Sequence, residues 1–166
     1  YLIPTDQPPA LVAARLRSRF QDVFKEYAGE AARRNIPWTD VLTLASLIER
    51  EASADDRKIV SGILWNRLNK GMGLQVDATL QYIRGEPGNW WPVPQSEDKK
   101  LESPFNTYKY RGLPPHPIAN PSLASIDAAL NPVKTNCLYY IHDNNGTIRC
   151  SATYAGHLSN VNRYLK

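Results

Sequence analysis

The sequence predicts an α+β fold in which a helical N-terminal half packs on short antiparallel strands and long loops. Apolar residues recur every three or four positions through most of residues 8–70, which is typical of amphipathic helices. The middle of the chain is rich in proline and glycine, and two apolar segments near its end flank an Asn-Gly pair, which favours a β-hairpin. Helices followed by short strands in this order indicate the α+β class.

Three helices are expected in the first half of the chain. The first covers residues 8–33, where two prolines suit the first helical turn. The second covers residues 40–52, after the break at "NIPWTD". The third begins after "SADD", at residue 57, and ends at Gly71, because glycine readily adopts the left-handed conformation that closes a helix.

The second half is expected to contain shorter elements. Residues 74–83 fit either a short strand or a strand that runs into a helical turn. Residues 84–104 form a long loop rich in proline, glycine and charge, and long ordered loops tend to be functional. A short helix is expected within 122–132, then a hairpin within 137–150, and a final helix over 156–166.

Composition and charge exclude several classes of protein. The 166 residues are 42% hydrophobic and 22% charged, as in an ordinary globular domain, and no apolar stretch is long enough for a membrane helix. The net charge of +4 is scattered among acids rather than gathered in a basic run, so nucleic acid is not an expected partner. His157, one of three histidines, has no Cys or Asp partners at ligand spacing, so no metal site is predicted.

Two cysteines, Cys137 and Cys150, flank the predicted hairpin. If Asn145-Gly146 forms a two-residue turn, the cysteines are four residues out of register; if the turn is Asp143-Asn144, they face each other. Asn-Gly is the stronger turn signal, so the sequence argues against a disulfide.

The stretch "SLIEREAS" places two glutamates directly behind an apolar run. With about 100° per residue and Val41 at zero, Glu51 falls near 280°, inside the arc of the large apolar residues, whereas Glu49 falls near 80°, on the opposite shoulder. A carboxyl group pressed against apolar surface has a raised pKa and can donate a proton near neutral pH. Glu51 is therefore the candidate general acid, although glutamates at helix ends are more often merely solvated.

Six ordered blocks in the sequence resemble a known family. "ASLIEREA", "WNRL", "GMGLQVDATLQY", "SPFNTY", "GLPPHPIANPS" and the late "GH" are similar to the YceG-like (MltG) family of bacterial endolytic murein transglycosylases. The resemblance covers residues 38–166 as the catalytic domain, with residues 1–37 as a helical lead-in. It implies a lysozyme-like catalytic groove and a domain that lies outside the cytoplasmic membrane, tethered by an anchor that is absent from this sequence.

The resemblance also assigns roles to residues. It makes Glu51 the catalytic acid and Glu49, Asn66 and Arg67 supporting residues, with Arg67 expected to pair with Asp77 or Glu49. The expected contacts to the glycan come from Gln75, Asp77, Thr79, Asn106, Tyr108 and His157, whose amide, hydroxyl and ring groups suit sugar hydroxyls and N-acetyl groups. Several of these side chains could equally satisfy loop backbone or fix the wall of the site.

The sequence departs from the family pattern at four positions. Ala78 stands for the usual proline, Phe105 for a tyrosine and His116 for a glycine, and Gly156 replaces an acidic neighbour of His157. None of these changes removes the expected acid.

The activity implied by the resemblance is non-hydrolytic cleavage of the MurNAc-β-1,4-GlcNAc bond of peptidoglycan. Glu51 would protonate the leaving oxygen and then accept the proton of the muramic C6 hydroxyl as it attacks C1, which leaves a 1,6-anhydroMurNAc end. No metal, organic cofactor or second catalytic carboxylate is required, and peptidoglycan synthases are conceivable partners. The alternatives are a muramidase-type hydrolase, in which Asp77 would activate water, and a non-catalytic glycan-binding module.

Overall fold

The computed structural model describes residues 3–166 and divides the chain into two compact units, Tyr1–Trp38 and Thr39–Lys166. The first unit consists mainly of α1 (Pro9–Arg33), close to the predicted bounds. Phe20 and Phe24 pack their rings 4.5 Å apart, and Phe24 also contacts Trp38 at 6.4 Å. No helix among residues 3–166 has the length and hydropathy needed to cross a membrane.

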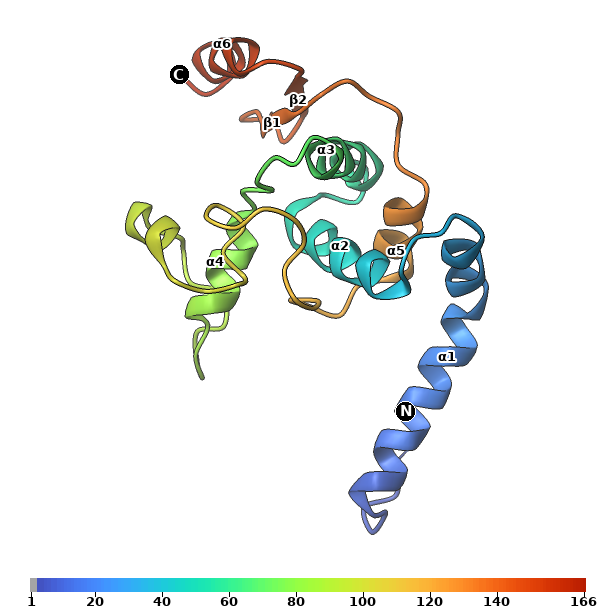
Figure 1. Ribbon diagram of the computed structural model, residues 1–166. Helices are drawn as coiled ribbons and strands as arrows, with labels where there is room; N and C mark the ends of the chain where they lie inside the picture. The colour runs from blue at the N-terminus through green and yellow to red at the C-terminus, as the bar shows by residue number, and fades with distance from the viewer. Residues whose placement is uncertain (1–2) are drawn as a thin grey trace. The chain divides into compact units, whose positions relative to one another are not determined.

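The core of the second unit is built around α2 (Trp38–Glu51), which lies among α3 (Arg57–Asn69), α4 (Asp77–Arg84) and α5 (Leu123–Leu130) (Figure 1). The apolar residues that place Glu51 on the inner arc are completely buried: Val41, Leu44, Leu47 and Ile48. Helix α3 packs on α5, and the indole N–H of Trp65 donates to the carbonyl of Ala129 at 2.8 Å.

The end of α3 turns the chain toward the site. Gly71 has a φ of +62°, and the backbone N–H of Met72 donates to the carbonyl of Arg67 at 2.9 Å, as in a Schellman cap. The chain then returns as the buried Leu74 and Val76. The predicted helix end at Gly71 is therefore confirmed.

Residues 74–83 contain no strand: an irregular segment runs into α4, so the helical part of the second predicted alternative is found and the strand is not. Gln75 has a φ of +55°, and its backbone N–H donates to the carbonyl of Thr107 at 3.0 Å. The hydroxyl of Thr107 accepts from the backbone N–H of Val76 at 3.0 Å and lies 3.0 Å from the hydroxyl of Thr79. The loop around Thr107 thus fixes the start of α4.

The long loop after α4 is tied down by charge. It contains a 3-10 helix, η1 (Ser96–Lys100), whose Asp98 accepts from the backbone N–H of Gln95 and from Arg84 at 2.8 Å. Ser122 caps α5 by accepting from the backbone N–H of Ser125 at 3.3 Å.

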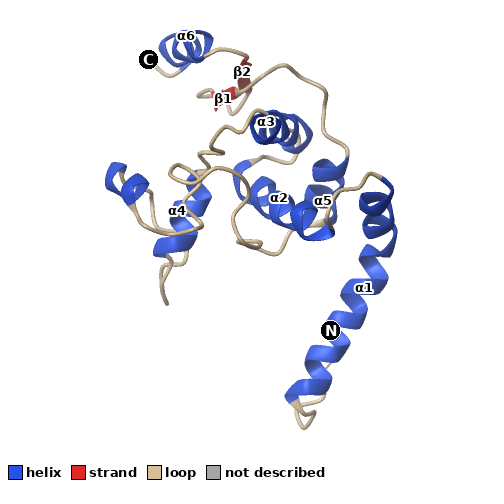
Figure 2. Cartoon of the chain, in the orientation of Figure 1, coloured by secondary structure: helices blue, strands red, loops and turns tan. Residues whose placement is uncertain are grey.

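Strands occur in a C-terminal hairpin, β1 (Tyr139–His142) and β2 (Ile148–Ser151), which pair antiparallel (Figure 2). Its loop has three residues, 144–146, and ends at Gly146 with φ +77°. Helix α6 (Tyr154–Tyr164) packs against both strands. The helix-rich chain with one small antiparallel sheet agrees with the predicted α+β class.

The prediction against a disulfide is wrong, since Cys137 and Cys150 are bonded with a Cα–Cα distance of 5.8 Å. Both registers considered from the sequence extend the first strand back to Cys137. The strand begins only at Tyr139, and the carbonyls of Thr135 and Cys137 both accept from the side-chain amide of Asn66 instead of pairing across the hairpin. Cys137 therefore lies outside the paired strand and is not held to its register, and it is bonded to Cys150.

Candidate active site

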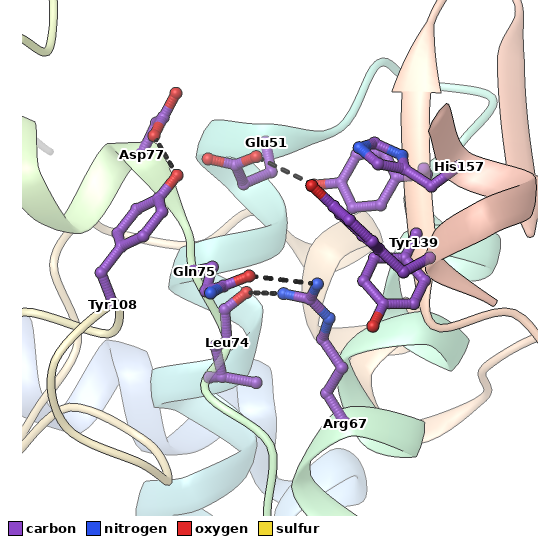
Figure 3. A pocket seen from close by; sticks show the side chains of 10 residues that line it. Glu51, Arg67, Leu74, Gln75, Asp77, Tyr108, Tyr139 and His157 are labelled. Carbon is purple, nitrogen blue, oxygen red and sulfur yellow. Dashed lines mark hydrogen bonds between the residues drawn. The ribbon is translucent and has the colours of Figure 1, made fainter. Parts of the chain in front are cut away.

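A cavity of about 280 Å³ lies where the end of α2, the start of α4 and the hairpin meet (Figure 3). Its lining is polar and aromatic: Glu51, Arg67, Leu74, Gln75, Asp77, Tyr108, Tyr139, Tyr140, Tyr154 and His157. In Figure 3, Glu51 lies between the Asp77–Tyr108 pair and the hairpin side of the cavity, where Tyr139 and His157 stand.

Glu51 is the last residue of α2, and each of its carboxyl oxygens has a protein donor. Its Oε2 accepts from the hydroxyl of Tyr140 at 2.9 Å, and its Oε1 accepts from the backbone N–H of Ala78 at 3.3 Å. The second contact is the longer one. It also depends on the departure from the family pattern at this position, because proline has no N–H to donate.

Burial raises the pKa of Glu51, and the nearby charge of Asp77 acts in the same direction. The hydrogen bonds from Tyr140 and Ala78 oppose this effect, since they stabilise the carboxylate, but the pKa remains raised. Glu51 therefore keeps its proton to a higher pH than an exposed glutamate, and this is the property required of a general acid.

Tyr140 was not among the site residues predicted from the sequence. It lies on β1, half-buried, 89 positions from Glu51. Burial and the adjacent carboxyl group of Glu51 raise the pKa of Tyr140 well above its usual value, so the phenol stays a neutral donor. No motif around "LYYIH" signals this contact, because it depends on how the hairpin docks.

Asn66 and Arg67, at the end of α3, hold the hairpin in place. Asn66 donates to the carbonyls of Thr135 and Cys137, and Arg67 donates through Nε to the carbonyl of Leu138 at 2.7 Å. These contacts lie directly before β1 and therefore fix where Tyr140 reaches.

Arg67 does not pair with Asp77 or Glu49 as expected. Its guanidinium is almost fully buried, donates to the carbonyl of Leu74 at 2.5 Å and reaches the side-chain oxygen of Gln75 at 3.4 Å. A planar fork of donors can satisfy several backbone carbonyls at once, and here it joins the wall from α3 to the segment before α4. Burial lowers the pKa of Arg67 without threatening its charge.

Glu49 serves the scaffold on the other side of α2. Its Oε2 accepts from the backbone N–H of Ser122 at 2.9 Å and from the hydroxyls of Ser122 and Ser125 at 2.6 and 2.7 Å. These hydrogen bonds keep the pKa of Glu49 below its usual value. Glu49 and Glu51 are thus separated in function, with Glu49 anchoring the start of α5 and only Glu51 facing the cavity.

Asp77 and Tyr108 form a second pair in the cavity. The hydroxyl of Tyr108 donates to Oδ1 of Asp77 at 2.5 Å. Burial and the carboxylate of Asp77 raise the pKa of Tyr108, so this phenol also stays protonated. Nζ of Lys99 lies 4.7 Å from the centre of the Tyr108 ring. Tyr108 itself lines the cavity.

Thr79 and Asn106 do not line the cavity, because both are completely buried. The amide of Asn106 donates to the carbonyls of Lys99 and Leu101 at 3.1 and 2.9 Å, and its oxygen accepts from the backbone N–H of Tyr108 at 3.0 Å. Asn106 therefore shapes the loop that presents Tyr108. Thr79 closes the first turn of α4 by donating to the carbonyl of Val76 at 2.7 Å.

The C-terminal wall of the cavity is aromatic. The ring of Tyr139 lies 5.6 Å from His157 and 5.8 Å from Tyr154. Nδ1 of His157 is buried and has no hydrogen-bond partner among the described residues. A Cβ on Gly156 would lie 3.1 Å from the side chain of Ser151, so a larger residue there requires this neighbour to shift slightly.

Two other departures from the family pattern meet outside the cavity. The rings of Phe105 and His116 are 4.6 Å apart, and Phe105 also lies 4.9 Å from Tyr82 on α4. Among residues 3–166, no group of three or more His, Cys, Asp or Glu side chains is arranged to hold a metal ion.

Comparison with known proteins finds similar bacterial proteins. It is 37% identical over 140 residues to the endolytic murein transglycosylase of Bacillus subtilis (strain 168), which covers 84% of this chain and 38% of that protein. It is 36% identical over 120 residues to the endolytic murein transglycosylase of Streptococcus pneumoniae serotype 2 (strain D39), covering 70% of this chain and 22% of that one. The chain therefore spans less than two fifths of the length of these curated relatives.

A solved structure and a family model also match this chain. The structure is similar to the crystal structure of a YceG-like protein from Listeria monocytogenes, with a TM-score of 0.84 and 33% identity, over 95% of this chain and 50% of that one. A model of the YceG-like family matches residues 1–163, so the match also includes the helical lead-in. The chain belongs to the YceG-like family.

Proposed function

We propose that this chain is the catalytic domain of an endolytic lytic transglycosylase that cleaves the MurNAc-β-1,4-GlcNAc bond of peptidoglycan and leaves a 1,6-anhydroMurNAc end. The observation that carries the proposal is Glu51, a single carboxyl group with a raised pKa in a polar and aromatic cavity. The names of the relatives from Bacillus and Streptococcus support the choice of substrate.

In the first step, Glu51 transfers its proton to the glycosidic oxygen while the bond from that oxygen to C1 breaks. The proton belongs on Oε1, because its contact to the backbone N–H of Ala78 is long at 3.3 Å, whereas Oε2 is held by Tyr140 at 2.9 Å. Tyr140 then stabilises the carboxylate that forms, so its hydrogen bond strengthens as charge develops.

In the second step, the carboxylate of Glu51 accepts the proton of the C6 hydroxyl while O6 bonds to C1. The nucleophile comes from the sugar itself, so no water is consumed and Glu51 ends the cycle protonated. The same group acts first as acid and then as base, which requires a pKa near the working pH. Burial raises the pKa of Glu51 in that direction, and the hydrogen bonds from Tyr140 and Ala78 oppose the rise.

A muramidase-type hydrolase is the second candidate, and the presence of Asp77 in the same cavity favours it. A hydrolase needs a second carboxylate to activate water or attack C1. One oxygen of Asp77 already accepts a short hydrogen bond from Tyr108, which disfavours that role. In the transglycosylase, the negative charge of Asp77 helps to keep Glu51 protonated.

The residues expected to contact the glycan divide into two groups. Gln75, Asp77, Tyr108 and His157 line the cavity and are proposed to contact sugar hydroxyls and N-acetyl groups. Thr79 and Asn106 are proposed instead to position the segments that carry them, because their side chains are buried. The cavity is proposed to be the centre of a lysozyme-like groove.

The proposed location is outside the cytoplasmic membrane, where peptidoglycan is found, with a tether in the longer protein and peptidoglycan synthases as proposed partners. The disulfide between Cys137 and Cys150 supports this location, since disulfides persist mainly in oxidising compartments.

The test compares the wild type with Glu51→Gln on uncrosslinked glycan strands. Wild type is expected to release anhydro-ended fragments, and Glu51→Gln is expected to bind the strands but release none. Asp55→Asn is the matched control, because Asp55 is an exposed acid just beyond α2 and should be replaceable without loss of activity. Full activity of Glu51→Gln would overturn the proposal, and melting curves exclude misfolding as the cause of a loss.

A further inference from the structure

A second hollow on the second unit is not used by the proposed reaction. It has a volume of about 510 Å³ and is lined by Tyr82, Gly85, Trp90, Trp91 and Ile118. Trp90 is 60% exposed and Tyr82 is 36% exposed. We refer to these five residues as the aromatic groove. Aromatic side chains exposed together in a concave surface mark an interaction site more often than scattered single ones do.

The aromatic groove is held rigidly although Trp90 and Trp91 lie on a loop. Gly85 approaches the loop so closely that a Cβ there would lie 2.6 Å from the carbonyl oxygen of Trp90. The side chain of Gln81 donates to the carbonyl of Pro92 at 3.2 Å, so both ends of the tryptophan pair are tied to the end of α4. An exposed tryptophan on a fixed backbone loses little conformational freedom when it binds a ligand.

The aromatic groove and the catalytic cavity share two helices, α2 and α4. The guanidinium of Arg50, the neighbour of Glu51, lies 3.7 Å from the ring centre of Trp91. Helix α4 contributes Asp77 to the cavity and Tyr82 to the aromatic groove, a step of about 7.5 Å along the helix axis. This step is shorter than a disaccharide, but the two side chains also lie about 140° apart around the helix, so a strand would have to wrap partly around α4 to reach both.

The chemistry of the aromatic groove fits sugars. The faces of pyranose rings carry C–H groups that pack on aromatic rings, and the methyl of an N-acetyl group suits an apolar pocket such as that beside Ile118. Trp90 is the tryptophan whose ring is exposed to a ligand. The ring of Trp91 is already stacked on the guanidinium of Arg50. Tyr82 is supported from behind by Phe105 and His116, at 4.9 and 6.2 Å between rings.

We propose that the aromatic groove binds N-acetylated sugar units of the same glycan strand, beyond the units that occupy the catalytic cavity. The identity of the strand rests on the proposed function. Binding at two separated places makes the domain favour long strands over short fragments, since only a long strand can occupy both.

The test measures kcat/KM for Trp90→Ala on long uncrosslinked strands and on the shortest fragments that the wild type cleaves. The expected result is about a tenfold loss on long strands and no change on short fragments. Trp90→Phe should recover most of the loss because it keeps a flat ring. Val93→Ala is the matched control, since Val93 is 76% exposed on the same loop but does not line the aromatic groove.

An equal loss on short and long substrates, or no loss on long strands, would overturn the proposal. A second measurement separates it from the proposed function, because it needs no catalysis. Binding of uncut strands is measured by calorimetry for Glu51→Gln alone and for Glu51→Gln combined with Trp90→Ala. If the wild type yields no anhydro ends but the Trp90→Ala change still weakens strand binding, the reaction is wrong and the aromatic groove stands. If both proteins bind strands equally, the aromatic groove is wrong whatever the reaction.

Discussion

Replacing Tyr140 by phenylalanine removes the hydroxyl that donates to Glu51 at 2.9 Å and leaves the ring in place. The ring itself packs edge-on against His142 at 5.9 Å, so the hairpin should remain folded. The change therefore tests the hydrogen bond rather than the shape of the cavity.

The size of the expected change in the pH profile follows from the free energy of that hydrogen bond. A hydrogen bond to a charged group contributes about 1.5–3 kcal/mol, and 1.36 kcal/mol corresponds to one pKa unit. Tyr140 favours the carboxylate, so its loss raises the pKa of Glu51 further. Protonated Glu51 is needed for the first step, so the falling limb of the pH profile should move upward by about one to two pH units, which corresponds to that free energy. The plateau rate should fall about tenfold, because the forming carboxylate loses a donor.

The assay is the pH profile of kcat/KM on uncrosslinked glycan strands for the wild type and Tyr140→Phe. The matched control is Tyr110→Phe, which removes a hydroxyl that donates to the exposed carboxylate of Glu102 at 2.9 Å, outside the cavity, and should leave the profile unchanged. A falling limb that stays in place, or moves to lower pH, would refute the assigned role of Tyr140.

Three further predictions follow from the same contacts. Ala78→Pro removes the backbone donor to Oε1 of Glu51 and should also move the falling limb upward, but by less than Tyr140→Phe because this hydrogen bond is longer; a downward shift would contradict it. The raised pKa of Glu51 means that the folded state loses stability as pH rises from the unfolded pKa through the folded one, so Glu51→Gln should melt above the wild type at neutral pH and the gap should shrink near pH 4. A constant gap between the melting curves would count against burial as the cause of the raised pKa. Replacing Cys137 and Cys150 by alanine should lower the free energy of unfolding by about 3 kcal/mol, measured in urea, since the bridge closes a short loop; an unchanged midpoint would show that the loop ends are held by other contacts.

Local patterns predicted the elements that depend on neighbouring residues. The helix end at Gly71 follows from the left-handed conformation that glycine readily adopts, and the structure uses it. Helical spacing also placed Glu51 on the apolar arc of α2, because that arc is a property of one helix. The family motif then agreed on the same residue.

Contacts between distant segments were not predictable in the same way. Tyr140 reaches Glu51 only because Asn66 and Arg67 bind backbone carbonyls before the hairpin, and a backbone acceptor leaves no trace in the side-chain pattern. The prediction that Cys137 and Cys150 are not bonded was wrong for the same reason. Asn106 shows a different limit, since its type suits a sugar or a loop equally and only its complete burial decides the direction of its amide.

The central claim is that Glu51 works alone as acid and base and that the sugar supplies the nucleophile. Digestion of uncrosslinked strands in water enriched in oxygen-18, followed by mass spectrometry of the new ends, tests this claim most directly. The account predicts ends lighter by one water than a hydrolytic product, without label, and their absence with Glu51→Gln. New reducing ends that carry oxygen-18 would contradict it and identify a hydrolase.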